Sequence, residues 1–175
     1  MGIVLVRVDD RLVHGQTVEA WAPFCKATGI VVASDEAKKN RIQKIAIESC
    51  SSNILAIKVE GIEELLGDRE SSKLPTHPSD GRPENLCCGG KNTDRVIVIF
   101  STLKDLMQAY NKGLRFSHIN IGNIHHNGKG KKLTPSVYLD KEDEDILQNL
   151  LRLGVEVDIR AVPSDRPVDI VALLH

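Results

Sequence analysis

The sequence lacks any hydrophobic run long enough to cross a membrane. A transmembrane helix needs about 20 consecutive apolar residues, and the apolar stretches of this chain are much shorter. The first of them, residues 2–8 (GIVLVRV), is followed at once by charged residues, which is not the pattern of a secretory signal peptide. We therefore expect a cytoplasmic protein without a membrane span of its own.

Cysteine pairs and an excess of charge are also missing. The cysteines form no C-x-x-C pair, and adjacent cysteines such as Cys87 and Cys88 rarely bind one tetrahedral ion, even with His77 nearby. We expect no metal site. The 23 Lys and Arg residues nearly balance the 24 Asp and Glu residues, so no overall field suggests a nucleic-acid partner.

A glycine-rich phosphate loop is absent as well. Residues 125–132 (HHNGKGKK) are not a Walker A motif, because Asn127 stands where the second glycine is required and no Ser or Thr follows Lys129. This argues against a nucleotide-binding α/β domain, which we keep as a weak alternative. The lysines of the segment either form a solvated loop or contact a phosphate or an acidic partner.

A cluster of reactive residues follows the first predicted strand. Residues 2–8 are apolar and rich in β-branched side chains, as in a buried strand. The next residues, 9–16 (DDRLVHGQ), bring two carboxylates, a guanidinium, a histidine and a glycine together. Ligands of open α/β sheets bind beyond the carboxyl ends of the strands. The octapeptide is therefore the candidate site.

The chemistry of this octapeptide suits phosphoryl transfer through His14. A neutral imidazole is a competent nucleophile near neutral pH. Arg11 can offer a planar fork of donors to the phosphoryl group. Gly15 and Gln16 open a predicted helix over residues 16–26, whose free N–H groups would point toward a phosphate on the histidine.

The two carboxylates leave alternatives open. Asp9 or Asp10 could hold the imidazole tautomer or could pair with Arg7 or Arg11. Equally, His14 could be an ordinary histidine at a helix start, with the charged residues forming a surface network. Residue chemistry alone does not separate these interpretations.

The octapeptide, followed by Trp21, closely resembles the active-site segment of enzyme IIB of the mannose/fructose/sorbose family of the sugar phosphotransferase system. Residues 31–36 (VVASDE) resemble the second strand of the family with its Ser-Asp-Glu turn. Residues 98–102 (VIFST) resemble the strand that ends in Phe-Thr-Asn, and residues 120–124 (NIGNI) resemble the Asn-Val-Gly-Gly-Met loop. The resemblance covers almost the whole chain except residues 67–94.

This resemblance implies a function. Enzyme IIB receives a phosphoryl group from a histidine of enzyme IIA and passes it to a hexose delivered by the membrane subunits IIC and IID. The acceptor in the family is Nδ1 of the histidine that corresponds to His14, and no metal or organic cofactor is implied. The expected catalytic residues are His14, Arg11 and Asp10, and the expected phosphate-binding residues are Gly15, Gln16, Ser101 and Thr102.

We accordingly expect the chain to associate peripherally with a membrane transporter complex, while a homo-oligomer is left open. The alternative function is that of a regulatory phosphoprotein, in which a binding partner reads the state of His14 and no sugar is transported. Two departures from the family keep it open: the segment 67–94, and Asn123 in place of the second glycine of its loop.

Alternating strand and helix patterns predict the fold. We expect strands at residues 2–8, 30–33, 54–59, 95–100, 117–121, 137–139 and 155–159. The helix predicted over 36–49 places Ile42, Ile45 and Ala46 on its buried face. We expect helices to begin at Thr102 and Asp140, and Gly154 to end the second of them. The prediction is a single domain, residues 1–175, built on an open, doubly wound, mainly parallel sheet of about seven strands with helices on both faces.

The segment 67–94 interrupts this alternation. Ten of its 28 residues are Gly, Pro or Ser, and it has no apolar periodicity. Such a composition is typical of a surface loop, and a loop of this length is unusual within a compact domain. We interpret the segment as an insertion, which is either functionally silent or a lid or docking surface.

Overall fold

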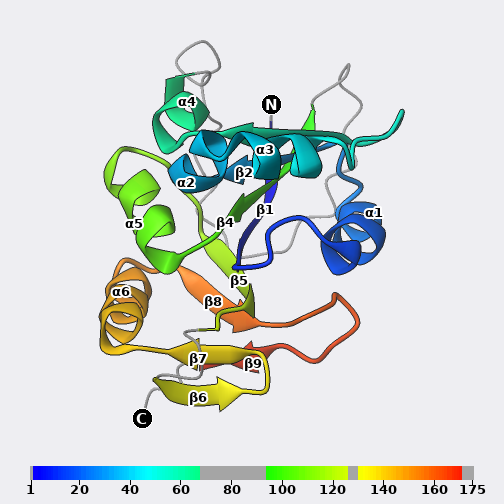
Figure 1. Cartoon of the computed structure of the whole chain (residues 1–175). Coiled ribbons are helices and arrows are strands. Elements are labelled where there is room, and N and C mark those ends of the chain that lie inside the picture. Colours follow the sequence, from blue (N-terminus) through cyan, green and yellow to red (C-terminus); the bar gives the residue numbers. More distant parts are fainter. Residues whose placement is uncertain (1, 68–93, 126–129, 171–175) are drawn as a thin grey trace.

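The computed structural model describes residues 2–67, 94–125 and 130–170. Its centre is a seven-stranded sheet with the order β3-β2-β4-β1-β5-β8-β9 (Figure 1). The strands are β1 (Gly2–Asp9), β2 (Gly29–Ala33), β3 (Ala56–Glu60), β4 (Arg95–Phe100), β5 (His118–Asn123), β8 (Glu156–Ile159) and β9 (Val168–Asp169). All neighbouring strands run parallel except β8 and β9. The predicted open, mainly parallel sheet is confirmed, and one edge of it carries the antiparallel strand β9.

One of the predicted sheet strands lies elsewhere. β7 (Val137–Leu139) is not part of the large sheet but pairs with β6 (Lys131–Thr134) in a small antiparallel hairpin. The seventh strand of the large sheet is β9, which the sequence did not predict. Only two residues of β9 pair with β8, and two residues are too few to show an alternating pattern.

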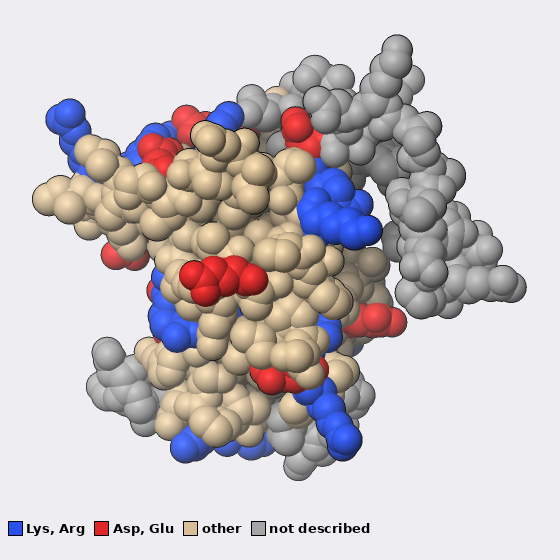
Figure 2. All heavy atoms as spheres, turned by 90° about the vertical axis from the view of Figure 1, so that its right-hand side faces the viewer, with Lys and Arg blue, Asp and Glu red and all other residues tan. Residues whose placement is uncertain are grey.

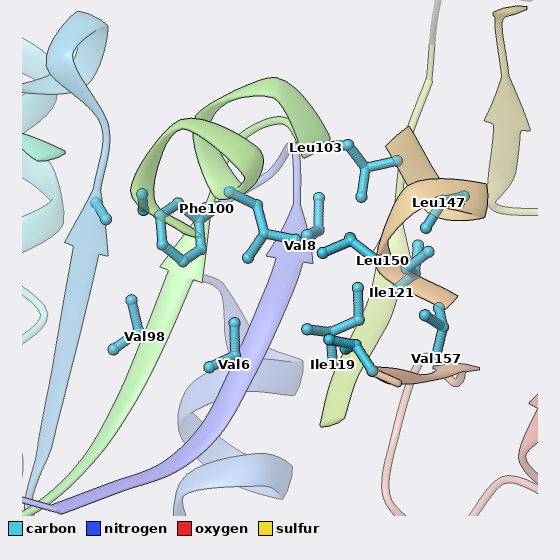
Figure 3. Packing of buried hydrophobic residues seen from close by; sticks show 14 of the residues in the cluster. Val6, Val8, Val98, Phe100, Leu103, Ile119, Ile121, Leu147, Leu150 and Val157 are labelled. Atoms are coloured by element: carbon cyan, nitrogen blue, oxygen red, sulfur yellow. The ribbon is translucent and has the colours of Figure 1, made fainter. Parts of the chain in front are cut away.

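Helices cover both faces of the sheet, as predicted. One face carries η1 (Gln16–Trp21), α1 (Ala22–Phe24), α2 (Asp35–Lys39) and α3 (Arg41–Glu48), and the other carries α4 (Ile62–Gly67), α5 (Leu103–Asn111) and α6 (Lys141–Arg152). Strand β1 serves both layers because its side chains alternate. Val6 and Val8 pack with Leu103 and Leu150 (Figure 3), whereas Leu5 packs in the layer of Trp21.

The predicted caps are confirmed. The side chain of Thr102 accepts a hydrogen bond from the amide of Asp105 at the start of α5, and Asp140 accepts one from the amide of Asp143 at the start of α6. Gly154 follows α6 with a φ of +82°, a conformation that glycine adopts at little cost. Within the described residues, no helix is both long and apolar enough to span a membrane. Most of the predicted insertion lies outside the described residues.

The helix predicted over 36–49 is wrong in one respect. It is broken at Asn40, whose ψ of 95° ends α2 and whose side chain caps α3 by accepting from the amide of Gln43. The break rotates α3, so Ile42 and Ile45 are 83% and 57% exposed while Ile47 is buried. Ala46, also predicted to be buried, is exposed. The prediction assumed one continuous helix, so it could not give the buried face of α3, which starts anew after Asn40.

We predict that Ile42→Gln with Ile45→Gln leaves the free energy of unfolding within about 0.5 kcal/mol of the parent, because exposed side chains lose little on substitution. The control, Ile47→Ala, should cost about 2–4 kcal/mol, because it removes buried methyl groups. Urea unfolding of the variants measures both effects. A loss of 2 kcal/mol in the double variant would show that these isoleucines are buried after all.

Candidate functional site

The octapeptide begins at the carboxyl ends of three adjacent strands. Val8 of β1 pairs with Phe100 of β4 on one side and with Ile121 of β5 on the other. The chain leaves β1 toward β2, which lies beyond β4, and later passes to β5 on the opposite side. The winding direction therefore reverses at β1, and ligand sites of doubly wound sheets form at such a switch point.

A buried ion pair stands at the end of β1. Arg7 and Asp9 are both 0% exposed, and Nη2 of the arginine lies 2.7 Å from Oδ2 of the aspartate. The guanidinium also donates to the side chain of Asn120 and to the carbonyl oxygens of Arg160 and Ala161. Burial lowers the pKa of Arg7, and the charge of Asp9 opposes this shift. An arginine stays protonated in proteins, so the pair is ionic.

Asp9 also connects this ion pair to the loop through hydrogen bonds. Its Oδ1 accepts a hydrogen bond from the backbone amide of Arg11 at 3.2 Å, and its backbone carbonyl accepts one from the amide of Leu12 at 3.0 Å. Leu12 is buried and has a φ of +56°, a conformation that costs energy for a branched residue. The loop therefore turns sharply at Leu12 and presents His14 on the far side of the turn.

His14 lies within reach of Arg11 and Gln16. Its Nδ1 is 2.9 Å from the carbonyl oxygen of Leu12, and because a carbonyl can only accept, this nitrogen carries the proton in the arrangement described. Nε2 lies 3.0 Å from Nη2 of Arg11, from which it can accept, and 3.2 Å from Oε1 of Gln16. The same Nη2 donates to Oε1 of Gln16 at 2.8 Å. Oδ2 of Asp9 is 3.7 Å from Nε2.

The helix after His14 begins as a π-helix rather than the predicted α-helix. The amide of Ala22 donates to the carbonyl of Thr17, five residues earlier, which is the π-helical spacing. At the start of this helix, the amides of Thr17 and Val18 both donate to the carbonyl of His14. The buried Thr17 hydroxyl donates to that carbonyl at 2.7 Å and accepts from the His14 amide at 3.0 Å. π-turns are rare and often occur at functional sites. The Thr17 hydroxyl thus holds both the amide and the carbonyl of His14.

The structure separates the other predicted site residues from His14. Asp10 points to His125, whose amide and Nδ1 lie 2.8 and 3.1 Å from its carboxylate. Ser101 donates to Asp105, and Thr102 caps α5. Among the described contacts, none joins Asp10, Ser101 or Thr102 to the imidazole. The carboxylate beside His14 is that of Asp9.

The sequence did not reveal a layer of residues behind the loop, which consists of Trp21, Asn120, Asp158 and Arg160. Asn120 donates to Asp158 at 2.6 Å, and Asp158 lies 2.6 Å from Nη2 of Arg160. Two guanidinium groups lie over the Trp21 ring, with Cζ of Arg7 and Arg160 at 5.3 and 5.4 Å from its centroid. One signal was present in the sequence: a charged residue, Arg7, inside an apolar run.

Asp158 is ionised in this layer. Burial alone would raise its pKa, but hydrogen bonds from His118, Asn120 and Arg160 outweigh burial and bring the pKa below its ordinary value. Among the described residues, no three His, Cys, Asp or Glu side chains are grouped so as to hold a metal ion. Figure 2 shows the side of the molecule on which α1 lies, where the charged side chains of the described residues form separate small groups.

The fold and the site together define a class of protein: an open parallel α/β domain that presents a histidine and an arginine on a loop after its central strand. A sequence model described as "PTS system sorbose subfamily IIB component" matches residues 3–74 and 90–175, and the chain belongs to this family. It is thus a component of a sugar phosphotransferase system. The unmatched residues 75–89 fall within the segment interpreted as an insertion.

Individual relatives agree with this assignment. The chain is 25% identical to the sorbose-specific EIIB component of Klebsiella pneumoniae, over 97% of this chain and 93% of that protein. It is 27% identical to the fructose-specific EIIB component of Bacillus subtilis, over 100% of this chain and 97% of that protein. The crystal structure of the IIBSor domain of the K. pneumoniae sorbose permease superposes with a TM-score of 0.80 at 25% identity, covering 98% of this chain and 95% of that one.

We predict that Gly122→Ala destabilises the protein by about 3 kcal/mol, at the upper end of the usual range for overpacking. A Cβ at this position would collide with the guanidinium of Arg7 and lie 2.5 Å from Oδ2 of Asp9. Neither group can withdraw, since both are buried and bonded on other sides. Gly67→Ala is the control, because a Cβ there meets nothing within 4 Å. Equal thermal midpoints for the two variants would contradict the close packing.

We predict that Asp158→Asn lowers the free energy of unfolding by about 1–2 kcal/mol at pH 7, through loss of hydrogen bonds to a nearly buried charge. A carboxyl whose folded pKa is depressed stabilises above its unfolded pKa, near 3.9, and this contribution disappears as the pH falls through the folded value. The difference between variant and parent should therefore shrink below about pH 4. The exposed Asp145→Asn serves as the control, and a difference that grows on acidification would contradict the ion-pair assignment.

Proposed function

We propose that His14 accepts a phosphoryl group from phosphorylated enzyme IIA and passes it to a hexose delivered by the membrane subunits IIC and IID. One observation carries the proposal: the imidazole of His14 lies at the switch point of the sheet with Nη2 of Arg11 at 3.0 Å. Family membership supports it, because IIB components work with IIA and with membrane components. Association with the membrane would then come through IIC and IID.

The transfer needs few participants. A lone pair of the His14 ring attacks phosphorus, the phosphorus–nitrogen bond to the donor histidine breaks, and its electron pair returns to the donor ring. Charge on the three phosphoryl oxygens must be stabilised throughout. Arg11 supplies a positive charge at the ring, and the amides of Gly15 and Gln16 at the start of η1 supply further donors.

The two ring nitrogens have different roles in this proposal. The resemblance makes Nδ1 the acceptor, yet in the described arrangement Nδ1 donates to the carbonyl of Leu12. The ring must therefore give up this bond and carry its proton on Nε2 before Nδ1 can attack. Oε1 of Gln16, 3.2 Å from Nε2, can then accept that proton in a hydrogen bond. The residues alone left the tautomer role open between Asp9 and Asp10. We assign it to Gln16, because Asp10 points to His125 and Asp9 is held by Arg7.

Two hydroxyls remain as secondary phosphate ligands. Ser101 already donates its proton to Asp105, so it would have to exchange this bond for a phosphate oxygen. Thr102 uses its oxygen as an acceptor and keeps its proton for donation. The alternative of a regulatory phosphoprotein gains nothing from the relatives named above, which are sugar-specific transport components.

We predict that incubation with phosphorylated enzyme IIA labels His14 alone, with the acid lability of a nitrogen–phosphorus bond. His14→Ala should abolish labelling and keep the fold, because the side chain lies on a loop and is partly exposed. His125→Ala, the control at the same edge of the sheet, should label normally. Mass-spectrometric mapping decides the matter, and label that persists in His14→Ala would refute the proposal.

We predict that Arg11→Ala slows labelling about 10- to 150-fold, the kinetic equivalent of a charged hydrogen bond worth about 1.5–3 kcal/mol. Arg11→Lys should recover only part of the rate, because the planar fork is lost. The exposed Arg41 on α3 provides the control, as Arg41→Ala removes the same charge away from the loop. Rapid-quench kinetics measure the rates, and an Arg11→Ala rate equal to that of the parent would show that Arg11 has no part in the transfer.

A further inference from the structure

Arg7 is the buried cation that the transfer itself does not use. We infer that Arg7 is a positioning residue that occupies the carboxylate of Asp9 and so prevents it from capturing Arg11 and His14. This inference rests on the proposed function, since it concerns the two groups that handle the phosphoryl group. In this inference, the buried Arg7–Asp9 ion pair affects the rate of phosphoryl transfer through the positions of Arg11 and His14.

Three basic groups compete for one carboxylate. Nη2 of Arg7 lies 2.7 Å from Oδ2 of Asp9, whereas Nε of Arg11 and Nε2 of His14 lie 3.7 Å from its oxygens. A movement of about 1 Å would turn either of the longer distances into a charged hydrogen bond. Arg11 and His14 are therefore close enough to bind the carboxylate of Asp9, but Arg7 makes the shortest contact with it.

Arg7 holds this position because it cannot move. Its guanidinium donates to Asn120 and to two backbone carbonyls, and it faces the ring of Trp21 at 5.3 Å. It is fully buried, while the side chain of Arg11 is 45% exposed. A rigid, desolvated donor loses little entropy in the contact, whereas an exposed one would lose both entropy and hydration.

Capture of either site group by Asp9 would be unproductive. An Arg11 guanidinium drawn onto Asp9 would leave the phosphoryl oxygens without their counter-charge. A His14 held as an imidazolium by a free carboxylate would have no lone pair for attack. An uncompensated carboxylate would also repel the incoming phosphoryl group. All three effects disappear when Asp9 is neutralised, either by Arg7 or by removal of its charge.

A double-mutant cycle distinguishes this mechanism from a merely structural role of Arg7. If Arg7 only held strands together, removal of the charge of Asp9 would add a second defect to the first. If Arg7 restrains Asp9, then Asp9→Asn should suppress the defect of Arg7→Gln. Breaking one side of a buried pair is also more harmful than neutralising both sides, so the double variant should fold at least as well as Arg7→Gln.

The experiment measures single-turnover labelling by phosphorylated enzyme IIA in the parent, Arg7→Gln, Asp9→Asn and the double variant, with circular dichroism as the check on folding. We expect Arg7→Gln to lower the maximal rate by tenfold or more with a smaller change in the half-saturating donor concentration. The double variant should recover at least tenfold over Arg7→Gln. Arg7→Lys, which keeps the charge, should retain more activity than Arg7→Gln at equal thermal stability.

Each remaining outcome is informative. A double variant that labels as slowly as Arg7→Gln, or more slowly, overturns the inference. If Arg7→Gln does not fold, the double variant is compared with Asp9→Asn, and a rate more than tenfold lower overturns it as well. A parent chain that takes no label refutes the proposed function, whereas a labelled parent without suppression refutes only the role of Arg7.

Discussion

The burial of the Arg7–Asp9 ion pair in the centre of the sheet is the constraint on which the site depends. Removing two charges from water costs several kcal/mol per ion unless each is paired and hydrogen-bonded. Here the guanidinium meets a carboxylate, an amide oxygen and two carbonyl oxygens. These partners come from β1, β5 and the segment after β8, so one cation ties together three strand ends that are distant in the sequence.

The same constraint explains several residues that a hydrophobic core would not require. Asn120 and Asp158 place polar groups on buried or nearly buried positions of adjacent strands because they extend the hydrogen bonds of Arg7. Gly122 leaves the space that the guanidinium fills. Trp21 covers the pair from the helical layer and anchors itself to the carbonyl of Ala161. The helix that starts beside His14 is thereby fixed to the sheet.

A few local hydrogen bonds then suffice to hold the loop on the buried Arg7–Asp9 pair. Asp9 holds the backbone at Arg11 and Leu12, and Thr17 holds it at His14. His14, the nucleophile of the proposed transfer, can thus lie at the surface, where a partner would reach it, without losing its orientation. Positioning of this kind supplies a large share of the rate in transfers that ask for little other chemistry.

The sequence predicted most of the fold and the loop that carries the candidate site, and the departures have physical causes. His14, Arg11 and Gln16 meet because the long side chains of Arg11 and Gln16 reach the imidazole from three and two residues away. The expected catalytic set named Asp10 and not Asp9, and β1 was expected to end at residue 8. It continues to Asp9, and side chains of a strand alternate, which puts Asp9 on the face of Arg7 and turns Asp10 away.

The hydrogen bonds of Asp9 and Thr17 imply that this loop is ordered in the unphosphorylated chain. Amide hydrogen exchange, followed by NMR in that chain, measures this order. The amides of Arg11, Leu12 and His14, which donate to Asp9 and Thr17, should exchange at least about tenfold more slowly than freely solvated amides. Exchange of these three amides at the rate of an unstructured peptide, alongside protected amides in β1, would contradict the account.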